Sequence, residues 1–158
     1  MRSLRHDRID TYSQKETLAM AEFQASRFAG IRTLNFVYNL RKSRRVEDSD
    51  ILLGSNKAAA IARLFRGKLN QQLFGNRYRR FRQELPVTIY LQTCPHMHLH
   101  GHIGLKDGVS ELRVRCFCQT FALKHPWIDE YPYIRQTKTE IGAEIYNSRF
   151  GADSLVVF

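Results

Sequence analysis

The alternation of apolar and polar residues predicts two neighbouring strands in the middle of the chain. Across residues 85–92, the apolar Val87, Ile89 and Leu91 alternate with Thr88, Tyr90 and Gln92. Residues 96–105 repeat the alternation, with apolar positions at Met97, Leu99, Ile103 and Leu105. Successive side chains of a strand point to opposite faces, so each segment would bury one face in a core. Cys94 and Pro95 interrupt the run, because proline cannot donate to a ladder, and the two strands are close enough to pair as a hairpin.

Apolar residues at helical spacing predict helices on either side of this hairpin. The clearest helix spans residues 54–75, with Ser55 as the candidate N-cap and Gly75 at its end. Its apolar stripe consists of Ile61, Leu64, Phe65, Leu69 and Leu73. A second helix begins at Ser110 and ends before Pro126; its inner face would consist of Val114, Phe117, Cys118, Phe121 and Ala122. Shorter helices are expected over residues 15–29 and 139–149.

Further strands are predicted over residues 31–38, 133–138 and 155–158, and residues 46–53 are predicted to be a connector. In the first of these strands, Leu34 and Phe36 share a face. Short strands with helices between them predict an α+β fold. Its mostly antiparallel sheet would be covered by helices mainly on one face, which leaves the other face for chemistry. We expect residues 31–158 to form one domain and residues 1–30 to form an N-terminal arm with a short helix.

The composition is that of a basic globular protein. The 158 residues are 43% hydrophobic and carry a formal net charge of +10. A chain of this kind can bury a core, and its charge favours polyanionic partners. No run approaches the ~20 apolar residues that span a bilayer, so no membrane partner is expected. The N-terminus lacks the apolar region of a secretory signal, and three cysteines without framework spacing indicate a reducing, cytoplasmic location.

The positive charge is concentrated in two clusters, residues 41–45 and 77–82. The second cluster interleaves Tyr78 and Phe81 with arginines, an arrangement that suits phosphate contacts combined with base stacking. Nucleic acid is therefore the first candidate partner. The predicted nucleic-acid-binding residues are Arg41, Lys42, Arg77, Arg79, Arg80 and Arg82.

Four of the six histidines occupy every second position of the segment 96–103, at His96, His98, His100 and His102. In a strand they would form a row of imidazoles on the face opposite the core. Two imidazoles spaced in this way can reach one metal ion, and a third ligand would come from Gln92 on the adjoining strand or from a flanking histidine. Imidazole suits Mn, Zn, Ni, Cu or Fe, whereas Mg prefers oxygen. The alternative is a histidine-rich strand that faces solvent or stacks on aromatic rings.

Tyr146 is a candidate nucleophile on the helix expected over residues 139–149. Arg149 follows it at i+3 and so lies on the same helical face. A phenol has a pKa near ~10, and a neighbouring guanidinium would stabilise either the phenolate or a phosphate oxygen. A metal beside a basic surface would polarise a phosphodiester for such an attack. The alternative is an ordinary surface tyrosine, one of seven in the chain.

Four segments resemble motifs of the HUH endonucleases, the superfamily of rolling-circle replication initiators from plasmids and phages. His98-Leu99-His100 resembles the His–hydrophobic–His motif, and residues 33–36, Thr-Leu-Asn-Phe, are similar to the first motif. Residues 68–76, followed by arginines, look like a helix of plasmid-type relatives. Residues 146–149, Tyr-Asn-Ser-Arg, resemble the Tyr-x-x-Lys motif with arginine in place of lysine.

This resemblance implies a ferredoxin-like, Rep-type antiparallel sheet of about five strands. It also implies that His98 and His100 bind Mg²⁺ or Mn²⁺ at a scissile phosphate, with Gln92 about where relatives often place a glutamate ligand. Tyr146, assisted by Arg149, would attack single-stranded DNA or an origin hairpin, leaving a 5′-phosphotyrosine and a free 3′-hydroxyl. Host replication proteins would be further partners.

Two alternative functions remain open at this point. Single-tyrosine transposases of similar size often follow the tyrosine with a glutamine, and residues 133–136, Tyr-Ile-Arg-Gln, are a loose match. The second alternative is a non-catalytic module that binds single-stranded nucleic acid. Tyr90, Phe81 and the arginines would then supply stacking and charge.

Overall fold

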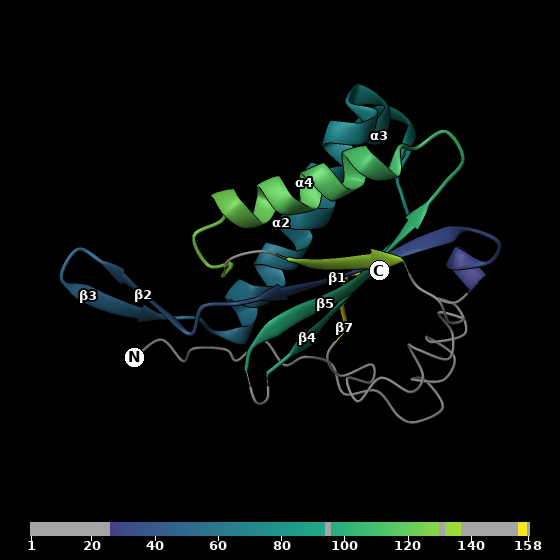
Figure 1. The fold of residues 1–158 in the computed structure, drawn as a ribbon. Coiled ribbons are helices and arrows are strands. Elements are labelled where there is room, and N and C mark those ends of the chain that lie inside the picture. Colours follow the sequence, from purple (N-terminus) through teal and green to yellow (C-terminus); the bar gives the residue numbers. More distant parts are fainter. Residues whose placement is uncertain (1–25, 94–95, 130–131, 137–154, 158) are drawn as a thin grey trace, which may run out of the picture.

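A five-stranded antiparallel sheet forms the centre of the protein (Figure 1). The computed structural model describes residues 26–93, 96–129 and 132–136, and the backbone of 155–157. The strands lie in the order β6-β1-β5-β4-β7. Their bounds are β1 Arg32–Asn39, β4 Val87–Gln92, β5 His98–Leu105, β6 Tyr133–Gln136 and β7 Leu155–Val157. The predicted α+β class and the antiparallel sheet are confirmed.

The predicted hairpin is the β4–β5 pair, whose register runs from Val87↔Ile103 to Gln92↔His98. β5 also pairs with β1, from Arg32↔Leu105 to Asn39↔His98, and is therefore central. Residues at alternate positions, including Leu34, Phe36, Tyr38, Val87, Ile89, Leu91, Leu99 and Ile103, form the sheet side of the core. The histidines lie on the other face of β5, as the alternation predicts.

Helices α2 (Ser55–Phe74) and α4 (Glu111–Lys124) cover the same side of the sheet (Figure 1). Aromatic rings fill the space between them and β1. The Phe65 ring centroid lies 4.7 Å from that of Phe36 and 5.2 Å from that of Phe121. The Tyr38 hydroxyl donates a 2.8 Å hydrogen bond to the Cys118 carbonyl, so this buried polar group is satisfied.

The structure confirms some of the predicted helix caps and corrects others. The backbone N–H of Arg113 donates to the Ser110 hydroxyl, which confirms that N-cap. The predicted Ser55 cap is wrong: Gly54 is the N-cap and accepts from the Ala58 N–H through its own carbonyl. Gly75 ends α2 with a positive φ of 56°, a conformation open to glycine. A short helix that was not predicted, α3 (Asn76–Phe81), follows directly.

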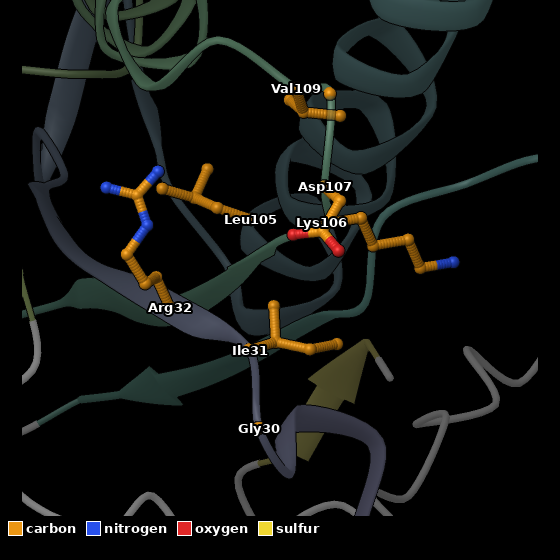
Figure 2. A pocket seen from close by; sticks show the side chains of 8 residues that line it. Gly30, Ile31, Arg32, Leu105, Lys106, Asp107 and Val109 are labelled. Carbon is orange, nitrogen blue, oxygen red and sulfur yellow. The ribbon is translucent and has the colours of Figure 1, made fainter.

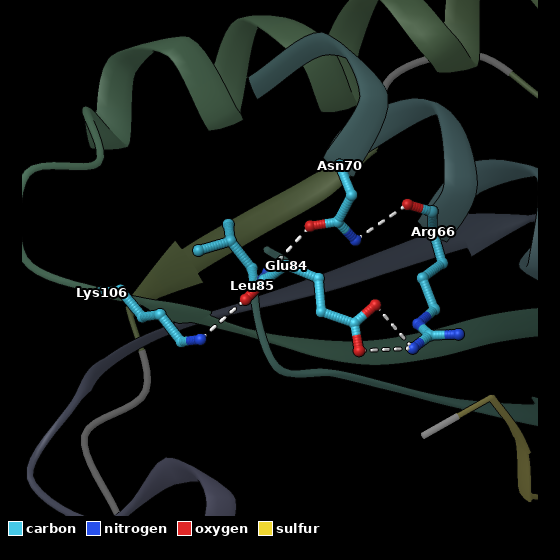
Figure 3. Close-up of polar contacts among 5 residues, drawn as sticks. All are labelled: Arg66, Asn70, Glu84, Leu85 and Lys106. Carbon is cyan, nitrogen blue, oxygen red and sulfur yellow. Dashed lines mark hydrogen bonds and ion pairs between the residues drawn. The ribbon is translucent and has the colours of Figure 1, made fainter. Parts of the chain in front are cut away.

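Polar contacts attach the end of α2 to the start of β4 (Figure 3). The fully buried Asn70 amide accepts from the Leu85 N–H at 2.8 Å and donates to the Arg66 carbonyl at 3.0 Å. Arg66 also donates to both carboxylate oxygens of Glu84, at 2.9 and 3.0 Å. On the other side, Lys106 donates to the Glu84 carbonyl at 2.7 Å. These bonds fix the chain direction immediately before β4.

The connector predicted over residues 46–53 is instead part of a hairpin. Strands β2 (Ser43–Val46) and β3 (Ser49–Leu52) pair antiparallel and project from the body of the protein (Figure 1). Every residue of both strands is exposed. Because neither strand has a buried face, their sequences show no alternation of apolar and polar residues. Periodicity alone therefore could not detect these strands.

Several predicted elements reach beyond the described residues. Residues 26–28 are helical and end before Gly30, but residues 15–25 of the predicted helix and the whole of 139–149 lie outside the described part. β6 covers the first four residues of the predicted strand 133–138. In the described ranges, no helix is long and apolar enough to cross a bilayer.

Candidate metal site on the histidine face

We use "histidine face" for the side of the sheet opposite α2 and α4. From β5 it carries His98, His100 and His102. The expected fourth member, His96, precedes the strand, so the row within the sheet has three histidines. His98 lies between Asn39 of β1 and Gln92 of β4, while His100 lies between Val37 and Tyr90, and His102 between Asn35 and Thr88.

His98 is half-buried, and its ring orientation is set by its own chain. Its Nδ1 lies 3.0 Å from the carbonyl oxygen of His96. A carbonyl only accepts hydrogen bonds, so Nδ1 carries the proton and the lone pair of the neutral ring is on Nε2. Metal-binding histidines are commonly held by this kind of second hydrogen bond.

His102 has a different environment from the other two histidines. Its side chain is 2% exposed, and its Nδ1 is hydrogen-bonded to the side-chain oxygen of Asn35, which is also buried. The ring centroids of His100 and His102 are 5.8 Å apart. His102 therefore joins β1 to β5 inside the protein, and the expectation that it serves as a third ligand has no support from its surroundings.

The three predicted metal-ligating residues lie together. Gln92 is the cross-strand partner of His98, and His100 is two residues further along the same face. Opposite residues on neighbouring strands have Cβ atoms about 4.5–5.5 Å apart, so the Gln92 amide can reach an ion held by His98. Among the described residues, no group of three His, Cys, Asp or Glu side chains could hold a metal. If these three residues held an ion, the donors would be two imidazoles and one amide oxygen, a set that suits Mn²⁺ better than Mg²⁺.

Two described tyrosines share the histidine face. Tyr90, opposite His100, is 2% exposed, and burial raises its pKa above the ordinary range, so it stays a neutral phenol. Tyr133 of β6 is 54% exposed and pairs with Val37, which in turn pairs with His100. Two strand spacings separate Tyr133 from His100, roughly 10 Å. The predicted nucleophile Tyr146 and its helper Arg149 lie outside the described residues.

The two predicted basic clusters lie at different ends of the sheet. Arg41 and Lys42 are exposed and follow β1 directly, at the end where Asn39 pairs with His98. The exposed arginines 77, 79, 80 and 82 lie on or next to α3, which leads into the start of β4. Gln92 and His98 lie at the opposite end of that strand. Only the first cluster is adjacent to the candidate metal site.

A separate pocket lies at the far end of β1 and β5 (Figure 2). It is formed between residues 30–32 and 105–109, and the side chains of Arg32 and Lys106 extend to opposite sides of it. Arg32 pairs with Leu105 at one end of the β1–β5 ladder, whereas His98 is at the other end. This pocket is therefore distinct from the histidine site.

Comparison with known proteins gives no relative for this chain. No protein family, no curated protein and no solved structure matches it.

Proposed function

We propose that this protein is a metal-dependent enzyme of the HUH type that nicks and transfers single-stranded DNA. The observation that carries the proposal is the grouping of His98, His100 and Gln92 on one face of the central hairpin. The ferredoxin-like, Rep-type fold belongs to the same proposal. It is supported by the chain order β1-α2-β4-β5-α4-β6 and the spatial order β6-β1-β5-β4, in which each helix connects two strands that are not neighbours.

The described residues would bind the ion and the substrate. His98 would bind through Nε2, His100 through its imidazole, and Gln92 through its amide oxygen. These residues would hold Mn²⁺ or Mg²⁺, which would supply Lewis-acid polarisation of the scissile phosphate. Arg41 and Lys42, next to His98 in the fold, would attract the DNA backbone to this end of the sheet.

In the proposed reaction, the Tyr146 hydroxyl attacks the phosphorus. The tyrosine O–P bond forms while the bond from phosphorus to the 3′ oxygen breaks. The phenol proton passes to solvent, and a solvent proton completes the 3′-hydroxyl. Arg149 would balance the charge on the phosphate oxygens. The 5′-phosphotyrosine retains the energy of the broken bond and can be rejoined to a strand.

The test is an adduct assay with labelled single-stranded DNA and Mn²⁺, resolved by denaturing electrophoresis. The proposal expects a covalent adduct that disappears in Tyr146→Phe and persists in Tyr133→Phe. Origin-like hairpins and random sequences are both offered, because the DNA site is unknown. Salt-sensitive binding without an adduct on any substrate would instead favour the non-catalytic single-strand-binding module.

A second candidate is a transposase-like strand transferase that uses Tyr133. It is favoured by one observation: Tyr133 is exposed on the histidine face, and the Arg135 guanidinium carbon lies 5.4 Å from its ring centroid. That cation could balance phosphate charge beside the phenol. Loss of the adduct in Tyr133→Phe, with retention in Tyr146→Phe, would select this candidate over the first.

A further inference from the structure

The end of the sheet next to His98 is joined to the segment that follows α4. The Arg41 N–H donates to the Trp127 carbonyl at 2.9 Å, and the Asp129 N–H donates to the Asn39 carbonyl at 2.8 Å. Leu40 and Ile128 form a β-bridge between these bonds. Residues 125–129, which follow α4, therefore lie beside the end of β1 where Asn39 pairs with His98.

Three cations from two other elements converge on this segment. The Lys57 ammonium of α2 lies 4.7 Å from the Trp127 ring centroid, a cation–π contact that fixes its position. Lys68 follows eleven residues later, about three helical turns, so both lysines lie on the same side of α2. Arg44 comes from the β2–β3 hairpin, and all three side chains belong to exposed residues.

His125 lies among these cations. Its ring stacks on Phe121 with centroids 5.4 Å apart, and its Nδ1 accepts from the Trp127 N–H at 3.3 Å. Burial first, and then the charges of Lys68, Arg44 and Lys57, lower the pKa of this imidazole.

Arg44, Lys57 and Lys68 have no acidic partner in the described part of the chain. No described carboxylate oxygen lies within 4.0 Å of a side-chain nitrogen of these three residues. The neighbouring Arg41 does have such a partner, since its Nε lies 3.9 Å from the Asp129 carboxylate. Exposed cations that lack carboxylate partners give this surface a positive potential, which attracts a polyanion.

We propose that Arg44, Lys57 and Lys68 form a track that binds the phosphate backbone of DNA as it leaves the histidine face around the end of β1. The two lysines alone span about 16 Å along α2, enough for several phosphates. The proposal rests on the proposed function for the identity of the polymer. It adds that DNA long enough to extend past the histidine face binds more tightly, because it also contacts these cations on the side of the sheet that α2 covers.

The test compares oligonucleotides of about 6 nucleotides, near the lower end of typical single-strand site sizes, and about 30 nucleotides, beyond their upper end. Binding is measured by fluorescence anisotropy over a salt series for wild type and Lys57→Gln/Lys68→Gln. For the long strand, the slope of log affinity against log salt should fall by about 0.7 for each lysine lost. The short strand, which covers only the histidine face, should show a much smaller change.

Two control variants separate a local track from net charge. Arg63→Gln/Arg113→Gln also removes two positive charges, but from another face of α2 and from the first turn of α4. It should leave the slope for the long strand near wild type, and Lys57→Arg/Lys68→Arg should retain most of it. Thermal unfolding of each variant checks the fold. Equal losses in the glutamine and control pairs would overturn the track.

The outcomes also separate this proposal from the proposed function. An adduct formed by the wild-type protein, with a long-strand slope that is unchanged in Lys57→Gln/Lys68→Gln, refutes the track alone. No adduct, with the predicted loss of slope, refutes nicking and leaves the track standing. Binding of anionic lipid vesicles through the same lysines, without length-dependent DNA binding, would refute the track and assign the surface to a membrane.

Discussion

Gly101 of β5 should be intolerant of even one added methyl group. A Cβ built at this position lies 2.4 Å from both Cε1 and Cζ of Phe36 and 3.0 Å from the Thr88 carbonyl oxygen. Ordinary carbon–carbon contacts are about 3.5–4.0 Å, so the overlap with the ring exceeds about 1 Å. Phe36 cannot move away easily, because its fully buried ring lies 4.7 Å from Phe65 and 5.0 Å from Tyr38, centroid to centroid.

The expected cost follows from these contacts. Forcing an extra carbon into a packed core costs about 1–3 kcal/mol. Gly101→Ala belongs at the upper end of this range, because the added carbon would meet the Thr88 backbone on one side and the tightly packed Phe36 ring on the other. The reduced freedom of the unfolded chain returns about 0.4–1 kcal/mol. The net loss should be about 2 kcal/mol, or a Tm lower by about 4–8 °C for a domain of this size.

Urea unfolding followed by circular dichroism measures this loss. Gly67→Ala is the matched control: Gly67 lies inside α2, and a Cβ there meets no atom within 4 Å. That substitution should stabilise the protein by about 0.5–1 kcal/mol. If Gly101→Ala proved as stable as wild type, the packing of Phe36 beneath β5, and with it the β1–β5 register, would be wrong.

Three further predictions concern the metal site, the core and the pH dependence. Gln92→Glu should bind Mn²⁺ more tightly in a calorimetric titration, because a carboxylate is a better ligand than an amide for a hard cation; equal or weaker binding would remove Gln92 from the site. Asn70→Ala should lower the free energy of unfolding by about 1–3 kcal/mol, because the buried Leu85 N–H loses its acceptor, and an unchanged urea midpoint would contradict this. His125 has a lowered pKa in the folded state, so the unfolded chain binds its proton more readily. Stability should therefore fall as the pH drops below about 6.5, and His125→Asn should reduce that fall; equal pH profiles would refute it.

Most of the elements that the sequence predicted have a buried face. The second predicted helix was correct from its Ser110 cap to its five inward residues, because helical spacing, cap and Pro126 all agree. The hairpin over β2 and β3 and the short α3 were missed. Their residues are mostly exposed, so neither carries a periodic apolar signal.

For the candidate site, the alternation of side chains along a strand predicts which residues share a face, but not their contacts with other strands. Alternation places His98, His100 and His102 on one face, but it does not reveal that His102 is buried against Asn35. That contact joins residues 67 positions apart and depends on the β1–β5 register. The position of Lys57 over Trp127 is likewise a tertiary feature, which explains why the basic track was missed while the dense arginine clusters were noticed.

The central claim is that His98 and His100 hold a divalent cation needed for DNA cleavage. The most direct measurement is the Mn²⁺-dependent covalent adduct on single-stranded DNA, compared between wild type and His98→Gln/His100→Gln, with retained binding of the same DNA as the check on folding. We expect an adduct in wild type that chelation abolishes and that the double variant fails to form. An adduct that survives either chelation or loss of both histidines would contradict it.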